Sequence, residues 1–536
     1  MITIAITASL LLATQAPPQD SHHHGDAGTL GVVKFANSCS ADVQPAFAHG
    51  MALLHSFEFG QAMDAFAGVV QADSSCGIAL WATGLAQWGN PFAATVRPPA
   101  QVQAGRATLE RAAAAGAKTA RERDYIAAAA SLYDRFESTD QPARMRAYRD
   151  AMGRLSATYP DDPEAAAFYA LSLAAAADPA DKTYVDQLKA GAILEKLWQS
   201  QPEHPGLAHY IIHAYDVPGL APRAVTAARR YATIAPDAPH ALHMPSHTFT
   251  RLGYWQDSID TNILSAAAAR KVNAIGEELH ASDYQAYAYL QSGQDAAARR
   301  LVDALPEILS RRGPVTASAA PPPAAAFAAA AIPARYALER GAWADAARLE
   351  PRATAFPYAD AMTWFARALG AARMRDVPAA RAAVDELQKC IDRTAQAKET
   401  YWVEQGAIQK LGASAWLALA EGRTADALAA MREAADREDR TEKSAISPGP
   451  LAPARELLGE MLLELKQPKE ALAEFRKTMA KEPNRFRGLA GAGAAATQAD
   501  DRAAARTYYG QLLTICKKAD TPGRPELRAA RSATGR

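Results

Sequence analysis

The sequence has no excess of either charge and no long apolar run outside its first 16 residues. Lys plus Arg and Asp plus Glu each number 58 among the 536 residues. A chain with this balance offers no basic surface for nucleic acid, and it carries no polybasic run for a membrane surface. Beyond residue 16, no segment reaches the ~18 consecutive apolar residues that a membrane span needs. We therefore expect neither a nucleic-acid partner nor a membrane span.

Cysteine is also scarce. The four cysteines, Cys39, Cys76, Cys390 and Cys516, are too few for a disulfide scaffold. If the protein is exported, Cys39 and Cys76 could close one bridge, and two buried thiols are the alternative. The sequence does not choose between them.

Complete catalytic motifs are missing as well. The chain contains no Gly-x-Ser-x-Gly nucleophile motif and no phosphate-binding P-loop. The sequence therefore favours a binding protein over an enzyme.

The N-terminal residues have the composition of a targeting segment. Residues 1–16, MITIAITASLLLATQA, form an apolar run that ends in a small-x-small pattern. This is typical of a secretory signal peptide, and an apolar N-terminal helix is the alternative. We expect a periplasmic or secreted protein.

Internal repeats are clearest near the C-terminus. In the segment PARELLGEMLLELKQPKEALAEFRKTMAKEP, Gly459 and Phe475 occupy positions that recur 34 residues later as Gly493 and Tyr509. These offsets resemble the tetratricopeptide repeat (TPR), a helix–turn–helix unit of 34 residues whose small positions let its two helices touch. Alanine is abundant and strand-like alternation is rare. The resemblance implies an all-α, TPR-type α-solenoid of antiparallel helix pairs.

Breaks in the helical patterning suggest how the chain is divided. Residues 17–38 look like a flexible mature N-terminus, and residues 311–323 form a Pro- and Ala-rich loop. The predicted parts are a signal peptide (1–16), a flexible start (17–38), an N-terminal solenoid (39–310), the loop (311–323), a C-terminal solenoid (324–520) and a disordered tail (521–536).

A second resemblance is carried by the segment HALHMPSHTFTRLGYW. It is similar to a group of secreted bacterial TPR proteins, and residues 38–66 and 448–456 fit the same pattern. The resemblance covers most of the chain and brings no assigned activity.

Two His-x₃-His pairs lie one repeat apart. His209 and His213 precede His243 and His247 by 34 residues each, and residues four apart share a helix face. Registering the repeats on their turn residues puts both pairs at positions 5 and 9 of successive first helices. In TPR proteins of known type, positions 2, 5, 9 and 12 line the concave groove. The other residues that the register assigns to such positions are Asp216, His240, His280, Asp283 and Tyr287.

This constellation points to a metal site in the groove. His209, His213, His243 and His247 are the predicted ligands, because imidazole suits Zn, Cu and Fe. His240, His280 and Asp283 are expected to ligate or support the ion. Asp216 and Tyr287 are expected to line the groove beside it. Pro245 predicts that the helix carrying the second pair is kinked or starts late.

Three alternatives remain open. Neither His pair contains the Glu of a His-Glu-x₂-His motif, so a metalloenzyme would need Asp216, Asp283 or Glu278 as its acid–base group. The histidines could instead be half-buried packing residues. For His55 we expect a hydrogen-bonded histidine in the core. They could also bind a peptide carboxylate or small ligand without metal. Our main hypothesis is an exported TPR scaffold that holds a metal and binds a protein, peptide or small ligand in its groove.

Overall fold

The computed structural model describes residues 29–311, 319–320 and 323–535. Within these ranges the chain is entirely helical and contains no strand, as predicted. None of the described helices is both long and apolar enough to cross a membrane. The predicted signal peptide lies outside the described residues.

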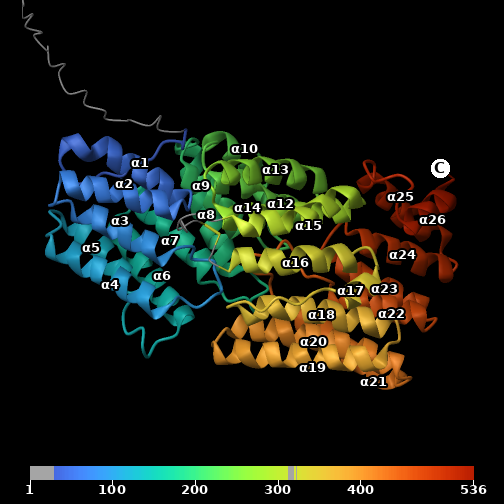
Figure 1. The fold of residues 1–536 in the computed structure, drawn as a ribbon. Coiled ribbons are helices and arrows are strands. Elements are labelled where there is room, and N and C mark those ends of the chain that lie inside the picture. The colour runs from blue at the N-terminus through green and yellow to red at the C-terminus, as the bar shows by residue number, and fades with distance from the viewer. Residues whose placement is uncertain (1–28, 312–318, 321–322, 536) are drawn as a thin grey trace, which may run out of the picture.

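The helices follow one another as antiparallel neighbours, from α1 at one end of an elongated molecule to α26 at the other (Figure 1). The N-terminal helices are η1 (Ala41–Val43), α1 (Gln44–His55), α2 (Phe59–Ala72), α3 (Gly77–Trp88), α4 (Pro99–Ala114), α5 (Ala120–Ala130), α6 (Gln141–Thr158), α7 (Pro163–Ala175) and α8 (Val185–Ser200).

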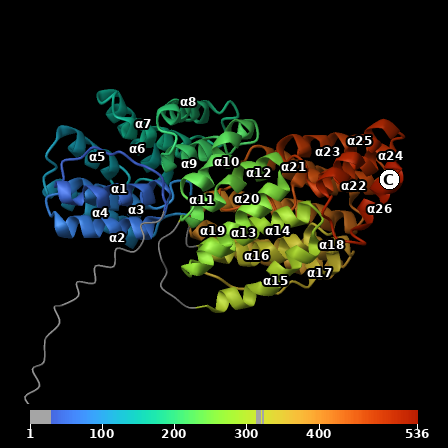
Figure 2. The same ribbon diagram turned by 90° about the horizontal axis from the view of Figure 1, so that it is seen from above.

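The central helices lie between the two ends in both views (Figures 1 and 2). They are α9 (Pro205–Ala214), η2 (Ala221–Ala224), α10 (Val225–Ile234), α11 (Pro239–His243), α12 (Pro245–Leu252), α13 (Trp255–Lys271), α14 (Ile275–Gln291) and α15 (Asp295–Ser310).

The C-terminal helices complete the solenoid. They are α16 (Ala324–Leu338), α17 (Trp343–Ala347), α18 (Pro357–Arg373), α19 (Val377–Gln396), α20 (Thr400–Ala420), α21 (Thr424–Asp439), α22 (Ala454–Glu464), α23 (Pro468–Lys481), α24 (Phe486–Gln498), α25 (Arg502–Ile515) and α26 (Pro525–Thr534).

Two large apolar cores run through the array, and the change from one to the other falls within the predicted loop 311–323. The first core extends from Leu30 to Phe249 and includes Ala319, and the second extends from Ala320 to Ala530. A smaller cluster joins Leu279 and Ile308 to Ile332, on opposite sides of residues 311–323. Helices on the two sides of the loop therefore also pack against each other.

Small residues bring paired helices together, as the repeat pattern predicts. A methyl group on Gly459 would lie 2.8 Å from Cζ of Phe475, and one on Gly493 would lie 2.6 Å from Cε1 of Tyr509. Both aromatic rings are buried between their helices. The recurring Gly and aromatic positions are thus the contact points of the helix pairs.

Both described ends of the chain are more ordered than the sequence suggested. The start was expected to be flexible to residue 38, yet Phe35 is buried, with its ring centroid 5.4 Å from that of Trp81 and 5.3 Å from that of Tyr125. The end was expected to be a disordered tail, yet it contains α26, which buries Leu527 and Ala530. In both cases apolar side chains on otherwise polar segments complete the core.

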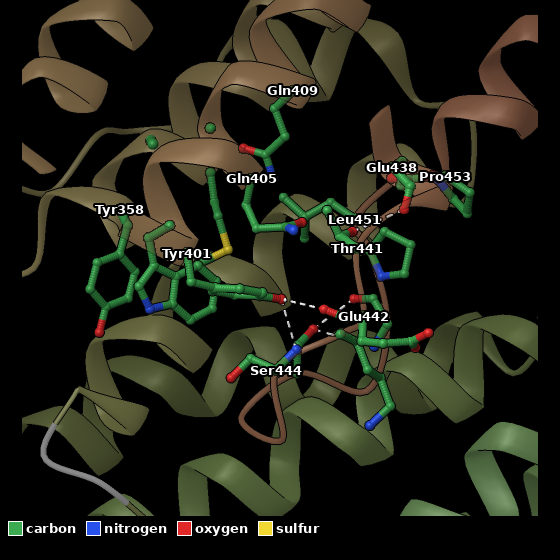
Figure 3. Close-up of a pocket in the computed structure, with 18 of the residues that line it drawn as sticks. Tyr358, Tyr401, Gln405, Gln409, Glu438, Thr441, Glu442, Ser444, Leu451 and Pro453 are labelled. Carbon is green, nitrogen blue, oxygen red and sulfur yellow. Dashed lines mark hydrogen bonds between the residues drawn. The ribbon is translucent and has the colours of Figure 1, made fainter. Parts of the chain in front are cut away.

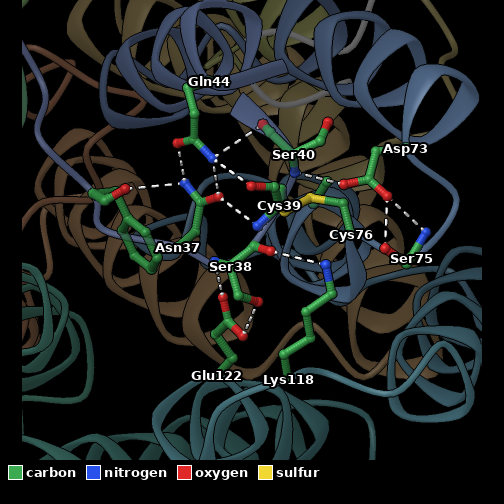
Figure 4. Close-up of a disulfide and its surroundings, with 12 residues drawn as sticks. Asn37, Ser38, Cys39, Ser40, Gln44, Asp73, Ser75, Cys76, Lys118 and Glu122 are labelled. Carbon is green, nitrogen blue, oxygen red and sulfur yellow. Dashed lines mark hydrogen bonds between the residues drawn. A yellow bond between two sulfur atoms is a disulfide. The ribbon is translucent and has the colours of Figure 1, made fainter. Parts of the chain in front are cut away.

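A disulfide joins Cys39 to Cys76, which settles the alternative that the sequence left open (Figure 4). Its surroundings are held by hydrogen bonds from the backbone N–H of Ser38 to Glu122 (2.7 Å) and from that of Ser40 to Asp73 (2.8 Å). The bridge therefore fastens the start of the described chain to the beginning of α3. Cys390 and Cys516 are free and buried.

The helix contacts can be tested with two glycines in neighbouring helices. A methyl group on Gly491 in α24 would lie 2.3 Å from the buried ring of Phe475, whereas one on Gly510 in α25 would meet nothing within 4 Å. We expect Gly491→Ala to destabilise the protein by about 1–3 kcal/mol through overpacking. Gly510→Ala should stabilise it by roughly 0.5–1 kcal/mol because alanine favours the helix. Urea unfolding followed by circular dichroism measures both, and equal stabilisation would contradict this packing.

Candidate metal centre

Six histidines from four helices come together in the central part of the solenoid. His209 and His213 lie on α9, His240 and His243 on α11, His247 on α12, and His280 on α14. All six side chains are buried, with exposed fractions between 0 and 7%. The 34-residue spacing therefore predicted which histidines lie close together.

The helix that carries the second pair is interrupted at Pro245, as predicted. α11 ends at His243, and α12 begins at Pro245. Met244 between them keeps helical dihedral angles (φ −53°, ψ −36°), so the two segments stay nearly continuous. His243 and His247 thus remain on one face, with their Nε2 atoms 3.1 Å apart.

The histidines form two groups of three, and this differs from the single set of four that the sequence suggested. The α9 group contains His209, His213 and His240, and the α14 group contains His243, His247 and His280. Within each group, one ring nitrogen of every histidine lies within 4.8 Å of the others. The division arises on α11: the ring of His240 lies 5.0 Å from that of His209, whereas the ring of His243 lies 4.4 Å from that of His280.

Buried acceptors fix the orientation of the α14 group. Nδ1 of His243 lies 2.6 Å from Oδ1 of Asn262, and the Asn262 amide is itself fixed by donation to the Ser258 carbonyl (2.7 Å). Nδ1 of His247 lies 2.9 Å from the Asp216 carboxylate. An amide oxygen and a carboxylate can only accept, so both Nδ1 atoms must carry the proton. Nε2 of each ring is then an unprotonated lone pair if the ring is neutral.

Burial keeps these rings neutral. Removal from water lowers the pKa of His243 well below its ordinary value, and the neighbouring His280 and His247 add to this effect. Burial also lowers the pKa of His247, although Asp216 partly offsets this. Two lone pairs therefore face each other across 3.1 Å with no proton between them. A cation that both nitrogens bind removes this repulsion.

The spacing of the nitrogens suits one ion. Zinc–imidazole bonds of about 2.0–2.1 Å separate two ligands of a tetrahedral ion by roughly 3.4 Å. The hydrogen bonds at Nδ1 are those that commonly orient metal-bound histidines. His280 has a comparable support, because it is hydrogen-bonded to the backbone of Ile446.

The α9 group differs in one respect, because no acceptor fixes the proton of His240 at Nδ1, so Nε2 of His240 can donate to His209. Nδ1 of His209 lies 2.7 Å from the carbonyl oxygen of His55, so its Nε2 is the free lone pair, 3.2 Å from Nε2 of His240. Burial lowers the pKa of His209 to about 3. Nε2 of His213 and Nδ1 of His240 have no hydrogen-bond partner among the described residues. Buried nitrogens without partners are costly unless something binds them.

Asp216 lies beside the centre, as expected, and its carboxylate is shared. Besides His247 it accepts from Arg251 Nε (2.9 Å) and Lys443 Nζ (3.1 Å). Burial would raise its pKa, but Lys443 and Arg251 more than offset this and hold the pKa well below its ordinary value. Asp216 is therefore an ionised group that orients His247.

Two of the predicted residues are turned away from the histidines. Asp283 accepts from Nε of the buried Arg335 at 2.8 Å, and the hydroxyl of Tyr287 accepts from Nη1 of the buried Arg485 at 2.6 Å. Both arginines come from the C-terminal half, which packs against this side of α14. The prediction of Asp283 as a ligand and of Tyr287 as a groove residue did not anticipate this packing.

Other residues at the centre were missed from the sequence. Tyr284 places its hydroxyl 3.4 Å from Nε2 of His247, and its position four residues after His280 could have indicated this. Phe92 stacks on His213 with ring centroids 4.0 Å apart. Asn262, Phe92 and Lys443 come from distant parts of the chain, and no sequence pattern links them to the histidines.

A small hollow of about 420 Å³ lies against the histidines and is roofed by loops. Its lining residues are Asn90, Phe92, Ala93, Ala94, Thr95, His213, His240, His247, His280, Ala319, Trp402, Ser444, Ala445 and Ile446. One of these loops connects α3 to α4. Arg97 fastens it by donating to the carbonyls of Trp88 (3.2 Å) and Ala93 (3.0 Å), and Asn90 donates to the carbonyl of Ala319 (3.0 Å). The predicted open groove is therefore covered at this point.

A larger cavity of about 980 Å³ adjoins this hollow (Figure 3). Trp402 and Ser444 line both spaces. The loop that carries Ser444 separates them. Tyr401 fixes this loop, because its hydroxyl donates to the Glu442 carbonyl (3.0 Å) and accepts from the Ser444 N–H (2.8 Å). Figure 3 shows the amide groups of Gln405 and Gln409 beside this aromatic wall.

A third cluster of potential ligands has a different hydrogen-bond pattern. Nε2 of His55 lies 2.9 Å from Oε2 of Glu164, and Nε2 of His204 lies 2.9 Å from Oε1 of the same carboxylate. The carboxylate can only accept, so each Nε2 carries a proton, and Nδ1 of His55 accepts from the Tyr210 hydroxyl (2.8 Å). His55 is thus a hydrogen-bonded core residue, as expected. Its role at the centre is to hold His209 through its carbonyl.

Comparisons with known proteins identify no family. No protein-family model matches the chain, and no curated protein matches its sequence. Among solved structures, the human IFIT1 dimer with PPP-AAAA aligns with a TM-score of 0.37 and 11% identity over 89% of this chain and 95% of that chain. The TPR domain of P58(IPK) aligns with a TM-score of 0.20 and 14% identity over 70% and 98% of the two chains. These likenesses concern the helical-repeat fold.

The hydrogen-bonded role of Glu164 can be tested by deletion of its carboxylate. Glu164→Ala leaves two buried imidazole N–H groups without an acceptor, and we expect a loss of about 3–5 kcal/mol in the free energy of unfolding at pH 7. Glu110→Ala is the matched control, because Glu110 is 64% exposed in its pair with Arg106. Its loss should stay within about 1 kcal/mol. Equal effects in denaturant unfolding would contradict the assigned role.

Proposed function

We propose that this chain is an exported helical-repeat protein that binds transition metal through its six buried histidines. The observation that carries the proposal is the contact between Nε2 of His243 and Nε2 of His247. Both atoms are lone pairs, because Asn262 and Asp216 hold the protons of the two rings at Nδ1. A buried, neutral pair in this arrangement is stable when a cation lies between the two nitrogens.

The ligand set narrows the choice of metal. All six proposed ligands are imidazoles, and the free thiols of Cys390 and Cys516 belong to the second core. Imidazole donors suit zinc, copper and iron, whereas magnesium and calcium prefer oxygen. We therefore propose zinc, copper or iron as the resident metal.

The adjoining cavity supports a binding function for the solenoid. Its wall combines aromatic rings with amides and charged groups, the mixed lining of ligand sites. We propose that a ligand or a segment of a partner protein binds there, separated from the histidines by the loop that carries Ser444.

A metalloenzyme is the second candidate, and one observation favours it. Each group has three histidines, and three protein ligands leave an open position on a tetrahedral ion. Of the carboxylates that the sequence offered as the acid–base group, Asp216 contacts a ligand through its hydrogen bond with His247.

Export is supported by the disulfide. Cys39 and Cys76 are bridged, and structural disulfides persist in oxidising compartments such as the periplasm. The apolar character of residues 1–16 fits the same route.

Metal content tests the proposed function directly. Protein purified without a polyhistidine tag should retain zinc, copper or iron by elemental analysis, and a chelator should lower its midpoint of thermal unfolding. His243→Asn should bind less metal than wild type and respond less to the chelator. His49→Gln should behave as wild type, because His49 belongs to none of the histidine groups. Wild-type protein that takes up none of the three metals and ignores the chelator would refute the proposal.

Thiol titration tests export. Protein recovered from the periplasm or medium should show two reactive thiols in denaturant, from Cys390 and Cys516, and four after reduction. Recovery of the protein only in the cytoplasm, with four free thiols before reduction, would contradict this part of the proposal.

A further inference from the structure

We infer that the centre holds two metal ions, one in the α9 group and one in the α14 group, which share one small bridging ligand in the hollow. This inference rests on the proposed function, since it requires that the histidines bind metal at all. It goes beyond that function by fixing the number of ions, their separate ligand sets and the space between them.

Two separate points of convergence argue against one shared ion. The closest ring nitrogens are His209 Nε2 with His240 Nε2 (3.2 Å), and His243 Nε2 with His247 Nε2 (3.1 Å). Each pair lies within a single group. Ligands of one ion with bonds of about 2.1 Å lie at most roughly 4.2 Å apart. Each pair meets this limit, and the sets of ring nitrogens that all lie within 4.8 Å of one another are the two groups of three, so the pairs belong to different sets.

The grouping comes from the ring nitrogens and not from the ring centroids. Centroid separations run up to 6.4 Å within each group, for His213 with His240 and for His247 with His280. Between the groups, the centroids of His213 and His247 are 5.9 Å apart. The six rings are therefore packed together, and the two sets are defined by nitrogens that lie within 4.8 Å of one another.

The third ring of each group supplies the remaining donor. Nε2 of His213 is buried and has no hydrogen-bond partner among the described residues. Its ring is held against Phe92, which fixes its plane. His280 is held by its hydrogen bond to the Ile446 backbone. Each ion thus has three imidazole ligands and one open position.

Both open positions face the same space. His213 and His240 of the α9 group and His247 and His280 of the α14 group all line the hollow of about 420 Å³. Paired ions in metalloproteins commonly lie about 3.5–4 Å apart, where one ligand reaches both. The roof formed by Phe92, Trp402 and Ile446 restricts the bridging ligand to a small one, such as water, hydroxide, dioxygen or a small inorganic anion.

The charge of the site favours copper in its monovalent form. The six imidazoles are uncharged ligands, and the carboxylate bound to one of them, Asp216, is already paired with Arg251 and Lys443. Little negative charge is left to balance two buried cations. Because the cost of burying an ion rises with its charge, two cuprous ions are accommodated more easily than two divalent ions.

The number of ions per chain tests the inference. The parent protein for this experiment is the full chain with His22, His23 and His24 replaced by asparagine, so that this N-terminal histidine tract adds no metal. Chelator-treated protein is titrated anaerobically with Cu(I), and in parallel with Zn(II), and bound metal is counted after gel filtration. We expect two equivalents of Cu(I).

The outcomes separate the inference from the proposed function. No bound metal in either titration would overturn both. One equivalent of the metal that binds would leave the proposed function standing and overturn the two-ion inference. Three equivalents would also overturn it, because the His55, Glu164 and His204 cluster would then bind metal.

Single replacements assign the ions to their groups. His213→Asn and His280→Asn should each reduce the bound Cu(I) from two equivalents to one, and the double variant should bind none. His49→Gln is the control and should keep two. Circular dichroism checks the fold, and the ratio in the parent protein decides the number of ions if a variant does not fold. Loss of both ions from a folded His213→Asn variant would overturn the assignment of separate ligand sets.

The bridging ligand is tested by magnetic resonance. After oxidation of the bound copper with hexacyanoferrate(III), each ion becomes Cu(II) and each hexacyanoferrate(III) gains one electron. Two bridged Cu(II) ions should give much less electron paramagnetic resonance intensity than the copper content requires. The folded His213→Asn variant should give one full spin per copper. Full intensity for both ions in the parent protein would overturn the shared ligand.

Discussion

The hydrogen bonds that hold the proton at Nδ1 of His209, His243 and His247 govern the chemistry of this centre. Asn262, Asp216 and the carbonyl of His55 accept from His243, His247 and His209. Each acceptor lacks a proton to give back, so the inner nitrogens are left as lone pairs. Burial prevents the rings from relieving the repulsion by taking up a second proton. The arrangement therefore favours a bound cation. Hydrogen bonds of the same kind orient histidines at metal sites.

The solenoid supplies these constraints because successive helices pack side by side. The proposed ligands lie on α9, α11, α12 and α14. α13 carries Asn262, which accepts from His243. The interruption at Pro245 keeps His243 and His247 on one face. The C-terminal half then covers the centre, since Ser444 to Ile446 and Trp402 line the hollow. A repeat array, usually an open surface, is closed here around its polar residues.

The contrast between the histidine groups shows why composition alone does not define a metal site. The cluster of His55, Glu164 and His204 has two imidazoles and a carboxylate, a common ligand set. In that cluster the inner nitrogens donate to Glu164, so every close contact is already a hydrogen bond. In the α14 group, the Nε2 lone pairs of His243 and His247 face each other. Whether the ring nitrogens in close contact carry a proton therefore distinguishes a hydrogen-bonded core cluster from a candidate metal centre.

The fold and most of the ligands could be predicted from periodicity. Helix pairs recur every 34 residues, so Gly459, Phe475 and the two His-x₃-His pairs reveal both the architecture and the shared face. The division into two groups could not be predicted, because it depends on how α11 is rotated between its neighbours. Asp283 was misplaced because its partner Arg335 lies in the next half of the chain. Asn262 and Phe92 carry no pattern, since only tertiary packing brings them to the histidines.

The central claim concerns where metal lies, and anomalous diffraction tests it most directly. Crystals of the copper-loaded protein, measured on both sides of the copper absorption edge, should show two anomalous peaks per chain. One should lie within bonding distance of His209, His213 and His240, and the other within bonding distance of His243, His247 and His280. A single peak shared by both groups, or a peak at Glu164 with none at either group, would contradict this account.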